Sequence, residues 1–127
     1  MAGVLIVDDN PSIRFILRSF VEKYGYTVCG EAGQGAESIE KAERLQPDLV
    51  LLDLAMPVMN GAEATSVLRR MLPNVKIILF SLHADGIGKA LAAAVGADVV
   101  LSKAETVTKL ADHLKALLPT PVAESSG

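Results

Sequence analysis

Residues 49–53, Leu-Val-Leu-Leu-Asp, form a run of large aliphatic side chains that ends abruptly in a carboxylate. The next residues, 54–61, read Leu-Ala-Met-Pro-Val-Met-Asn-Gly and are typical of a turn. A short apolar run bounded by turn residues predicts a strand that is covered on both faces, as in a parallel sheet. Ligands of open parallel sheets bind at the carboxyl ends of the strands. We therefore expect the chemistry of this protein to take place on Asp53.

Similar segments on both sides predict an α/β fold. Apolar runs predict strands over residues 4–7, 49–53, 75–80 and 97–101, and the less apolar residues 27–32 are expected to form an edge strand. Helical spacing of apolar residues predicts helices over residues 11–24, 36–45, 62–72 and 84–95, and a last helix with Val107, Leu110, Ala111, Leu114 and Leu117 on one face. Alternation of strands and helices is typical of a doubly wound parallel sheet with right-handed crossovers. The sequence thus predicts a five-stranded sheet with five helices.

The first predicted helix shows how its limits and its buried face are encoded. Asn10 is a good N-cap, and Pro11 suits the first helical position. The inward face is expected to consist of the apolar residues at helical spacing, which are Ile13, Ile16, Leu17, Phe20, Val21 and Tyr24. Phe15 falls outside this face and is expected to be exposed.

Polar residues follow the predicted strands at the points where they end. Asp8 and Asp9 follow the first strand, Asp53 ends the third, Ser81 follows the fourth and Lys103 comes shortly after the fifth. Since parallel strands place these ends at one edge, the carboxylates would repel one another unless cations offset their charge. Lys103 and a divalent ion are the two candidates, and few oxygen ligands with room for water favour Mg²⁺. Taken singly, each residue is more often a cap, a turn residue or a surface charge.

Composition limits the class of protein. The chain has 127 residues, half of them hydrophobic, which suits one compact domain. A net charge of -3 argues against direct nucleic-acid binding. One cysteine, Cys29, and the absence of a signal peptide or membrane span predict a cytoplasmic location. Residues 1–118 are expected to form the domain, and residues 119–127 have the composition of a flexible tail or truncated linker.

These residues resemble the receiver domain of two-component response regulators, over roughly residues 3–118. The resemblance rests on the acidic pair Asp8-Asp9, on Asp53 with residues 54–61, on Ser81 and on Lys103. It implies a flavodoxin-like fold with strand order 2-1-3-4-5. It also implies a phosphoprotein of two-component signal transduction that catalyses only its own phosphotransfer and dephosphorylation and is not otherwise an enzyme.

The same resemblance implies a role for each site residue. Asp53 would accept a phosphoryl group from a sensor histidine kinase or phosphotransfer domain. Asp9 would bind Mg²⁺ directly and Asp8 mainly through water, with Asp53 and the backbone carbonyl of Ala55 as further ligands. Lys103 would pair with Asp53 and then with the phosphoryl group, Ser81 would hydrogen-bond a phosphoryl oxygen, and Val100 replaces an aromatic residue that usually rotates on activation.

The residues leave three classes of function to choose among. The resemblance is greatest to receivers attached to a helix-turn-helix output, because Ser81 carries a hydroxyl and no proline follows Lys103. This favours the regulatory domain of a transcriptional response regulator, in which phosphorylation controls partner binding or homodimerisation. A stand-alone receiver that acts by protein contact is an alternative. A Mg²⁺-dependent phosphatase acting through an aspartyl phosphate is disfavoured, since those enzymes typically carry a second aspartate at the position of Ala55.

Overall fold

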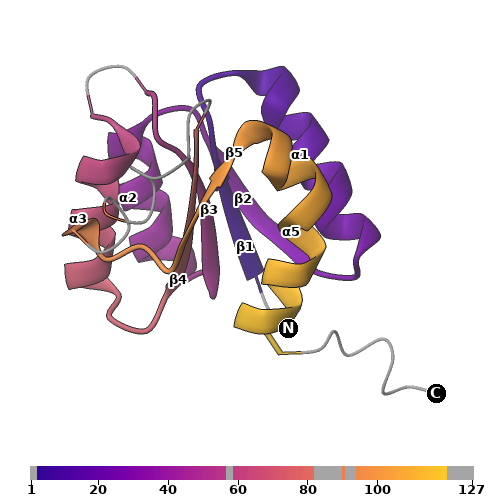
Figure 1. The fold of residues 1–127 in the computed structure, drawn as a ribbon. Coiled ribbons are helices and arrows are strands. Elements are labelled where there is room, and N and C mark those ends of the chain that lie inside the picture. Colours follow the sequence, from indigo (N-terminus) through magenta and orange to yellow (C-terminus); the bar gives the residue numbers. More distant parts are fainter. Residues whose placement is uncertain (1–2, 57–58, 82–89, 91–93, 120–127) are drawn as a thin grey trace.

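A five-stranded parallel sheet forms the centre of the molecule (Figure 1). The structure, a computed structural model, describes residues 3–56, 59–81, 90 and 94–119, and for residues 81, 103, 104, 106 and 107 it describes the backbone alone. The strand order is β2-β1-β3-β4-β5, as predicted. The described elements are β1 (Gly3–Val7), α1 (Pro11–Lys23), β2 (Thr27–Ala32), α2 (Gly35–Leu45), β3 (Leu49–Asp53), α3 (Gly61–Met71), β4 (Lys76–Ser81), β5 (Val99–Ser102) and α5 (Lys103–Leu117).

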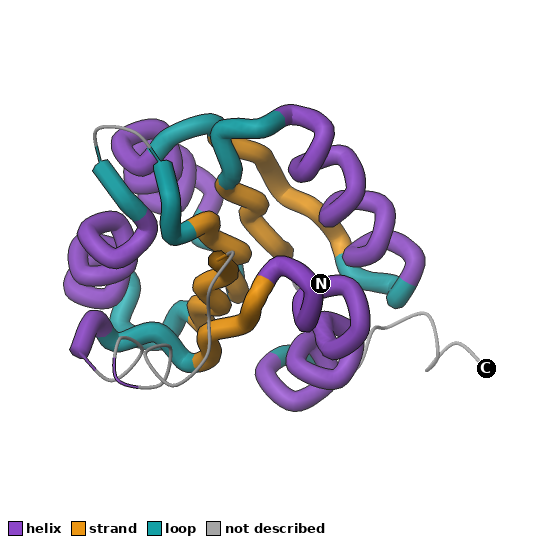
Figure 2. The backbone as a smooth tube through the Cα atoms, turned by 45° about the horizontal axis from the view of Figure 1, so that its top comes forward, coloured by secondary structure: helices purple, strands orange, loops and turns teal. Residues whose placement is uncertain are grey.

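Helices cover both faces of the sheet. Helices α1 and α5 lie on one side and α2 and α3 on the other, and Figure 2 shows the strands between these two layers. Successive side chains of a strand point to opposite faces. In β1, Val4 and Ile6 pack in the cluster that contains α1 and α5 residues, whereas Leu5 and Val7 pack in the cluster of α2 and α3. Burial on both faces explains why these strands are continuous apolar runs.

Helix α1 begins as predicted, but one residue that was assigned to its inward face is exposed. The side chain of Asn10 accepts hydrogen bonds from the backbone N–H groups of Ser12 and Ile13, at 2.8 and 3.4 Å. Phe15 is 69% exposed, as expected, but Ile16 is 45% exposed and was wrongly assigned to the inward face. Ile16 lies at the margin of the apolar stripe, where a helical side chain points along the surface.

The last strand begins two residues later than predicted, at Val99 instead of Ala97. Asp98 explains the difference, because its side-chain oxygen, in place of a backbone carbonyl, accepts an N–H of the neighbouring strand β4. Its Oδ2 accepts the Ile77 N–H at 2.8 Å and pairs with Nη2 of Arg69 at 2.9 Å. The helix predicted over residues 84–95 falls largely outside the described residues. Within the part that the structure describes there are four helices, and none could span a membrane.

Candidate functional site

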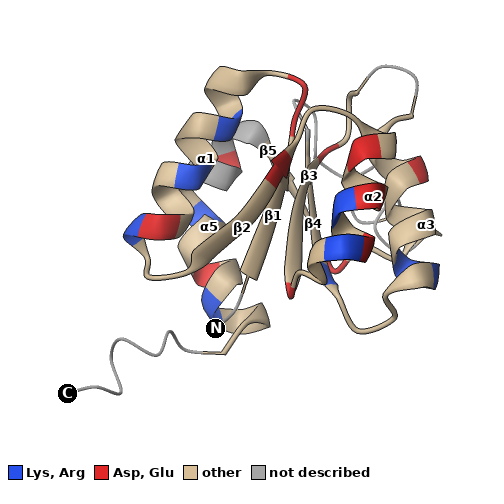
Figure 3. Cartoon of the chain, turned by 180° about the vertical axis from the view of Figure 1, so that it is seen from behind, with Lys and Arg blue, Asp and Glu red and all other residues tan. Residues whose placement is uncertain are grey.

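Three carboxylates meet where β1 and β3 end. These strands are neighbours, and Val7 pairs with Leu52, so Asp8 and Asp53 leave the sheet side by side. One carboxylate oxygen from each of Asp8, Asp9 and Asp53 lies within 4.8 Å of the others. The chain between β1 and α1 that contributes two of them is red in Figure 3. The sequence prediction that distant aspartates converge at one edge is therefore confirmed for these three residues.

The three carboxylates differ in exposure. Asp8 and Asp53 are 0% and 1% exposed, whereas Asp9 faces solvent. The Asn10 N–H donates to Oδ1 of Asp8 at 2.8 Å, and the Ala55 N–H donates to Oδ1 of Asp53 at 3.2 Å. Burial of carboxylates is costly unless hydrogen bonds or cations compensate. The site thus combines two shielded anions, held by backbone amides, with one that is open to solvent.

This donor set fits a hard divalent cation. Mg²⁺ prefers oxygen ligands, uses one or two carboxylates and keeps several waters. Carboxylate oxygens that lie within 4.8 Å of one another can share a single ion, directly or through a bound water. Ala55 is exposed and lies two residues after Asp53 in the loop that follows β3. Its amide contacts Asp53, and its carbonyl oxygen remains a predicted ligand.

Backbone register brings the remaining predicted residues to the same edge. Ser81 is the last residue of β4 and pairs with Ser102 of β5, and Lys103 follows directly as the first residue of α5. The side chains of Ser81 and Lys103 lie outside the described residues. Val100 pairs with Leu79, and its partly buried side chain packs in the cluster on the α2 and α3 face.

Gly61 is a site residue whose role the sequence analysis did not assign. Its N–H donates to the Leu54 carbonyl at 2.8 Å, which closes the loop after Asp53. A Cβ atom at this position would lie 2.7 Å from Cα of Leu54 and 3.0 Å from the carbonyl carbon of Asp53, and it would overlap the carbonyl oxygen of Asp53. Only glycine permits this approach of two backbones. The signal in the sequence was the glycine that ends the turn after β3.

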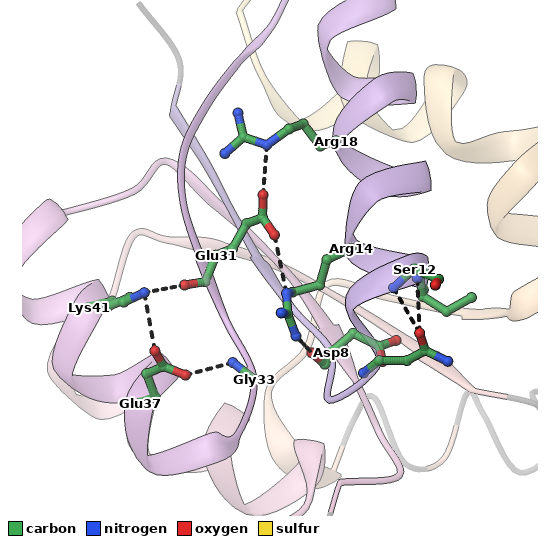
Figure 4. A network of polar contacts seen from close by, with 10 residues as sticks. Asp8, Ser12, Arg14, Arg18, Glu31, Gly33, Glu37 and Lys41 are labelled. Atoms are coloured by element: carbon green, nitrogen blue, oxygen red, sulfur yellow. Dashed lines mark hydrogen bonds and ion pairs between the residues drawn. The ribbon is translucent and has the colours of Figure 1, made fainter.

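A network of charged side chains surrounds the end of β2, which neighbours the acidic pair (Figure 4). Glu31 accepts Nε of Arg14 at 3.1 Å on one oxygen and Nε of Arg18 at 2.7 Å on the other. The hydrogen bond from Arg18 is the main cause that holds the pKa of Glu31 below its usual value. Lys41 donates to the Glu31 carbonyl and pairs with Glu37 at 3.2 Å. The Glu37–Lys41 pair has the i,i+4 spacing that is common for ion pairs on helices, whereas the contacts of Glu31 join separate elements.

Residues 4–115 match the family described as the response regulator receiver domain. The chain belongs to this family. The receiver domain is 46% identical over 78 residues to the chemotaxis protein CheY of Thermotoga maritima, covering 61% of this chain and 65% of that protein. It is 41% identical over 105 residues to the nitrate/nitrite response regulator protein NarL of Escherichia coli, covering 80% of this chain and 48% of NarL.

The fold of the receiver domain agrees with these relatives. The crystallised chemotaxis protein CheY4 of Vibrio cholerae superposes with a TM-score of 0.84 and 32% identity, over 93% of this chain and 99% of that chain. The match spans 65% of the length of the CheY relative and 48% of the length of NarL. The family and the doubly wound fold expected from the sequence are both confirmed.

Proposed function

We propose that this receiver domain accepts a phosphoryl group on Asp53 from a phosphohistidine of a sensor histidine kinase or phosphotransfer domain. An oxygen of the Asp53 carboxylate attacks phosphorus, the nitrogen–phosphorus bond breaks, and the imidazole keeps its electron pair. Hydrolysis of the resulting aspartyl phosphate restores the carboxylate and releases phosphate. The chain acts on no external substrate in this scheme.

The cluster of Asp8, Asp9 and Asp53 is the observation that supports this proposal. Three anionic oxygens within 4.8 Å, two of them on buried residues, are unfavourable without a compensating cation. Phosphoryl transfer requires positioning and charge neutralisation more than covalent chemistry. A nucleophilic carboxylate that belongs to a cation-binding cluster satisfies both requirements.

Each residue of the site has a distinct part in this proposal. Asp9, which is exposed, would bind Mg²⁺ directly, and the buried Asp8 mainly through water, with Asp53 and the Ala55 carbonyl as further ligands. When bound, the ion supplies charge neutralisation at the phosphoryl oxygens. Lys103 would form an ion pair with Asp53 and then with the phosphoryl group, and the Ser81 hydroxyl would donate a hydrogen bond to a phosphoryl oxygen.

The output that we propose is a change in partner binding or homodimerisation, as in the regulatory domain of a transcriptional response regulator. Because Val100 has no aromatic ring that could rotate, the structural change on phosphorylation would pass through the backbone of β4 and β5, which pair at Ser81 and Ser102. Residues 1–118 would form this unit and residues 119–127 a linker. With a net charge of -3, the domain itself would bind neither DNA nor a membrane.

A phosphorylation assay tests the proposal. Incubation with acetyl phosphate and Mg²⁺ should add one phosphoryl group, measured by intact-protein mass spectrometry. The adduct should be lost in hydroxylamine, because an acyl phosphate is cleaved there and a serine ester is not. Chelation of Mg²⁺ before incubation should prevent the reaction. Equal labelling in excess chelator, or an adduct that survives hydroxylamine, would contradict the assignment.

Replacement of Asp9 by alanine should weaken Mg²⁺ binding by at least about tenfold, since it removes an accessible oxygen ligand. Isothermal titration calorimetry or Mg²⁺-dependent amide shifts in NMR would measure the dissociation constant. Asp112→Ala is the matched control, because Asp112 is an exposed aspartate on α5 and its removal changes the net charge equally. An Asp9→Ala affinity equal to that of the control would remove Asp9 from the metal site.

A further inference from the structure

We propose that Arg14 is a positioning residue that fixes the acidic pair in its metal-binding arrangement before an ion arrives. This inference rests on the proposed function, because it concerns the same Mg²⁺ site. Arg14 lies in the second turn of α1 and none of its contacts in the network is to a carboxylate of the cluster. Its effect therefore passes through the backbone of Asp8.

The guanidinium of Arg14 makes two contacts at once. Nη1 donates to the carbonyl oxygen of Asp8 at 2.6 Å, and Nε donates to Oε1 of Glu31 at 3.1 Å. Figure 4 shows the guanidinium between these two groups. The side chain is 21% exposed, so solvent competes little for these contacts. A planar guanidinium is suited to such a double contact because its N–H groups have fixed directions.

The backbone N–H and the backbone carbonyl of Asp8 are therefore both held by hydrogen bonds. Its N–H donates to the Ala32 carbonyl at 3.1 Å, and its carbonyl oxygen accepts Nη1 of Arg14. Ala32 directly follows Glu31, so the end of β2 supplies both the acceptor for Asp8 and the anchor for Arg14. The Asn10 N–H then fixes the Asp8 carboxylate at 2.8 Å. The turn that carries Asp8 and Asp9 is thus defined by contacts that need no metal.

Glu31 is itself fixed from three directions, which makes it a firm anchor. Arg18 binds its second carboxylate oxygen at 2.7 Å, and Lys41 of α2 donates to its carbonyl. Preorganised ligands bind more tightly because less conformational entropy is lost on binding. Groups that orient metal ligands without touching the metal typically change its affinity by about 10- to 100-fold. Arg14 has the geometry for such a role.

Charge and positioning predict opposite effects of removing Arg14, so an experiment can separate them. Loss of a cation near three carboxylates would by itself strengthen Mg²⁺ binding. Loss of the contact to the Asp8 carbonyl would weaken it. Arg18→Gln is the matched control, because it removes the same charge and a Glu31 contact from the same helix but leaves the contact of Arg14 to the Asp8 carbonyl in place.

Titration of the metal-free proteins with Mg²⁺ tests the proposal. Arg14→Gln should bind Mg²⁺ about tenfold more weakly than the wild type, whereas Arg18→Gln, which keeps the contact of Arg14 to the Asp8 carbonyl, should bind at least about threefold more tightly than Arg14→Gln. At saturating Mg²⁺, phosphorylation of Arg14→Gln by acetyl phosphate should return to the wild-type rate. In the metal-free state the Asn10 amide should exchange with solvent faster in Arg14→Gln than in Arg18→Gln. Equal affinities of the two variants would overturn the proposal.

Arg14→Lys is the second variant, and it serves if Arg14→Gln fails to fold. Lysine keeps the charge and the aliphatic stem but cannot hold both oxygens in the geometry of the guanidinium. Its Mg²⁺ affinity should stay at least about threefold below that of the wild type, and an affinity equal to the wild type would overturn the role of the double guanidinium contact. Failure of the wild-type chain to bind Mg²⁺ would refute the proposed function instead.

Discussion

Asp53→Asn should abolish phosphorylation by acetyl phosphate and Mg²⁺ completely while leaving the fold intact. Asparagine has nearly the shape of aspartate but no nucleophilic carboxylate. Because Asp53 is 1% exposed and ends a strand that pairs with both β1 and β4, an isosteric side chain is the smallest change that the site accepts. Intact-protein mass spectrometry and circular dichroism would measure the two outcomes.

The same substitution should also raise the unfolding temperature in Mg²⁺-free solution, since one of three neighbouring negative charges is removed. Asp112→Asn, on the exposed face of α5, controls for the charge change and should be labelled like the wild type. Full labelling of Asp53→Asn would place the phosphoryl group on another residue. A large loss of stability would show that the carboxylate is needed for the fold.

Gly61→Ala should lower the free energy of unfolding by about 2–4 kcal/mol. The new methyl group would overlap the Asp53 carbonyl oxygen and lie 2.7 Å from Cα of Leu54, and both are backbone atoms that cannot rotate away. Gly61 is the first residue of α3, where alanine gains at most about 1 kcal/mol in helix propensity. The steric cost therefore exceeds the gain. Urea denaturation followed by circular dichroism would measure the change.

Gly33→Ala is the control for this prediction. A Cβ at residue 33 would meet its nearest atoms, Nη1 of Arg14 and Oε1 of Glu37, at 3.5 and 3.7 Å, which is ordinary contact distance. Its change in unfolding free energy should stay within about 1 kcal/mol. A Gly61→Ala protein as stable as this control would mean that the loop after Asp53 moves away at little cost.

Much of the fold could be predicted because parallel strands have a strong local signature. Runs such as residues 49–52 are apolar throughout, since helices cover both faces of the sheet. The first three site residues followed from the same reasoning, because every strand end lies at one edge. The positions of two strands were enough to predict that Asp8, Asp9 and Asp53 lie close together.

The features that were missed depend on contacts between segments that are distant in the sequence. Nothing near Arg14 in the sequence indicates that it donates to the Asp8 carbonyl, since side-chain to backbone contacts follow no period. The late start of β5 depends on Asp98, whose partners Ile77 and Arg69 lie on other elements. Ile16 differs from its buried neighbours only by its angle around the helix.

The joint between β5 and α5 contains no intervening loop. Ser102 is both the final residue of the strand and the N-cap of the helix, where its side chain accepts the Glu105 N–H at 3.0 Å and the Glu105 side chain accepts the Ser102 N–H at 3.0 Å. Lys103 is the next residue. If Lys103 binds the phosphoryl group as proposed, the end of β5 and the start of α5 should move with it together, because no flexible residues separate the strand from the helix.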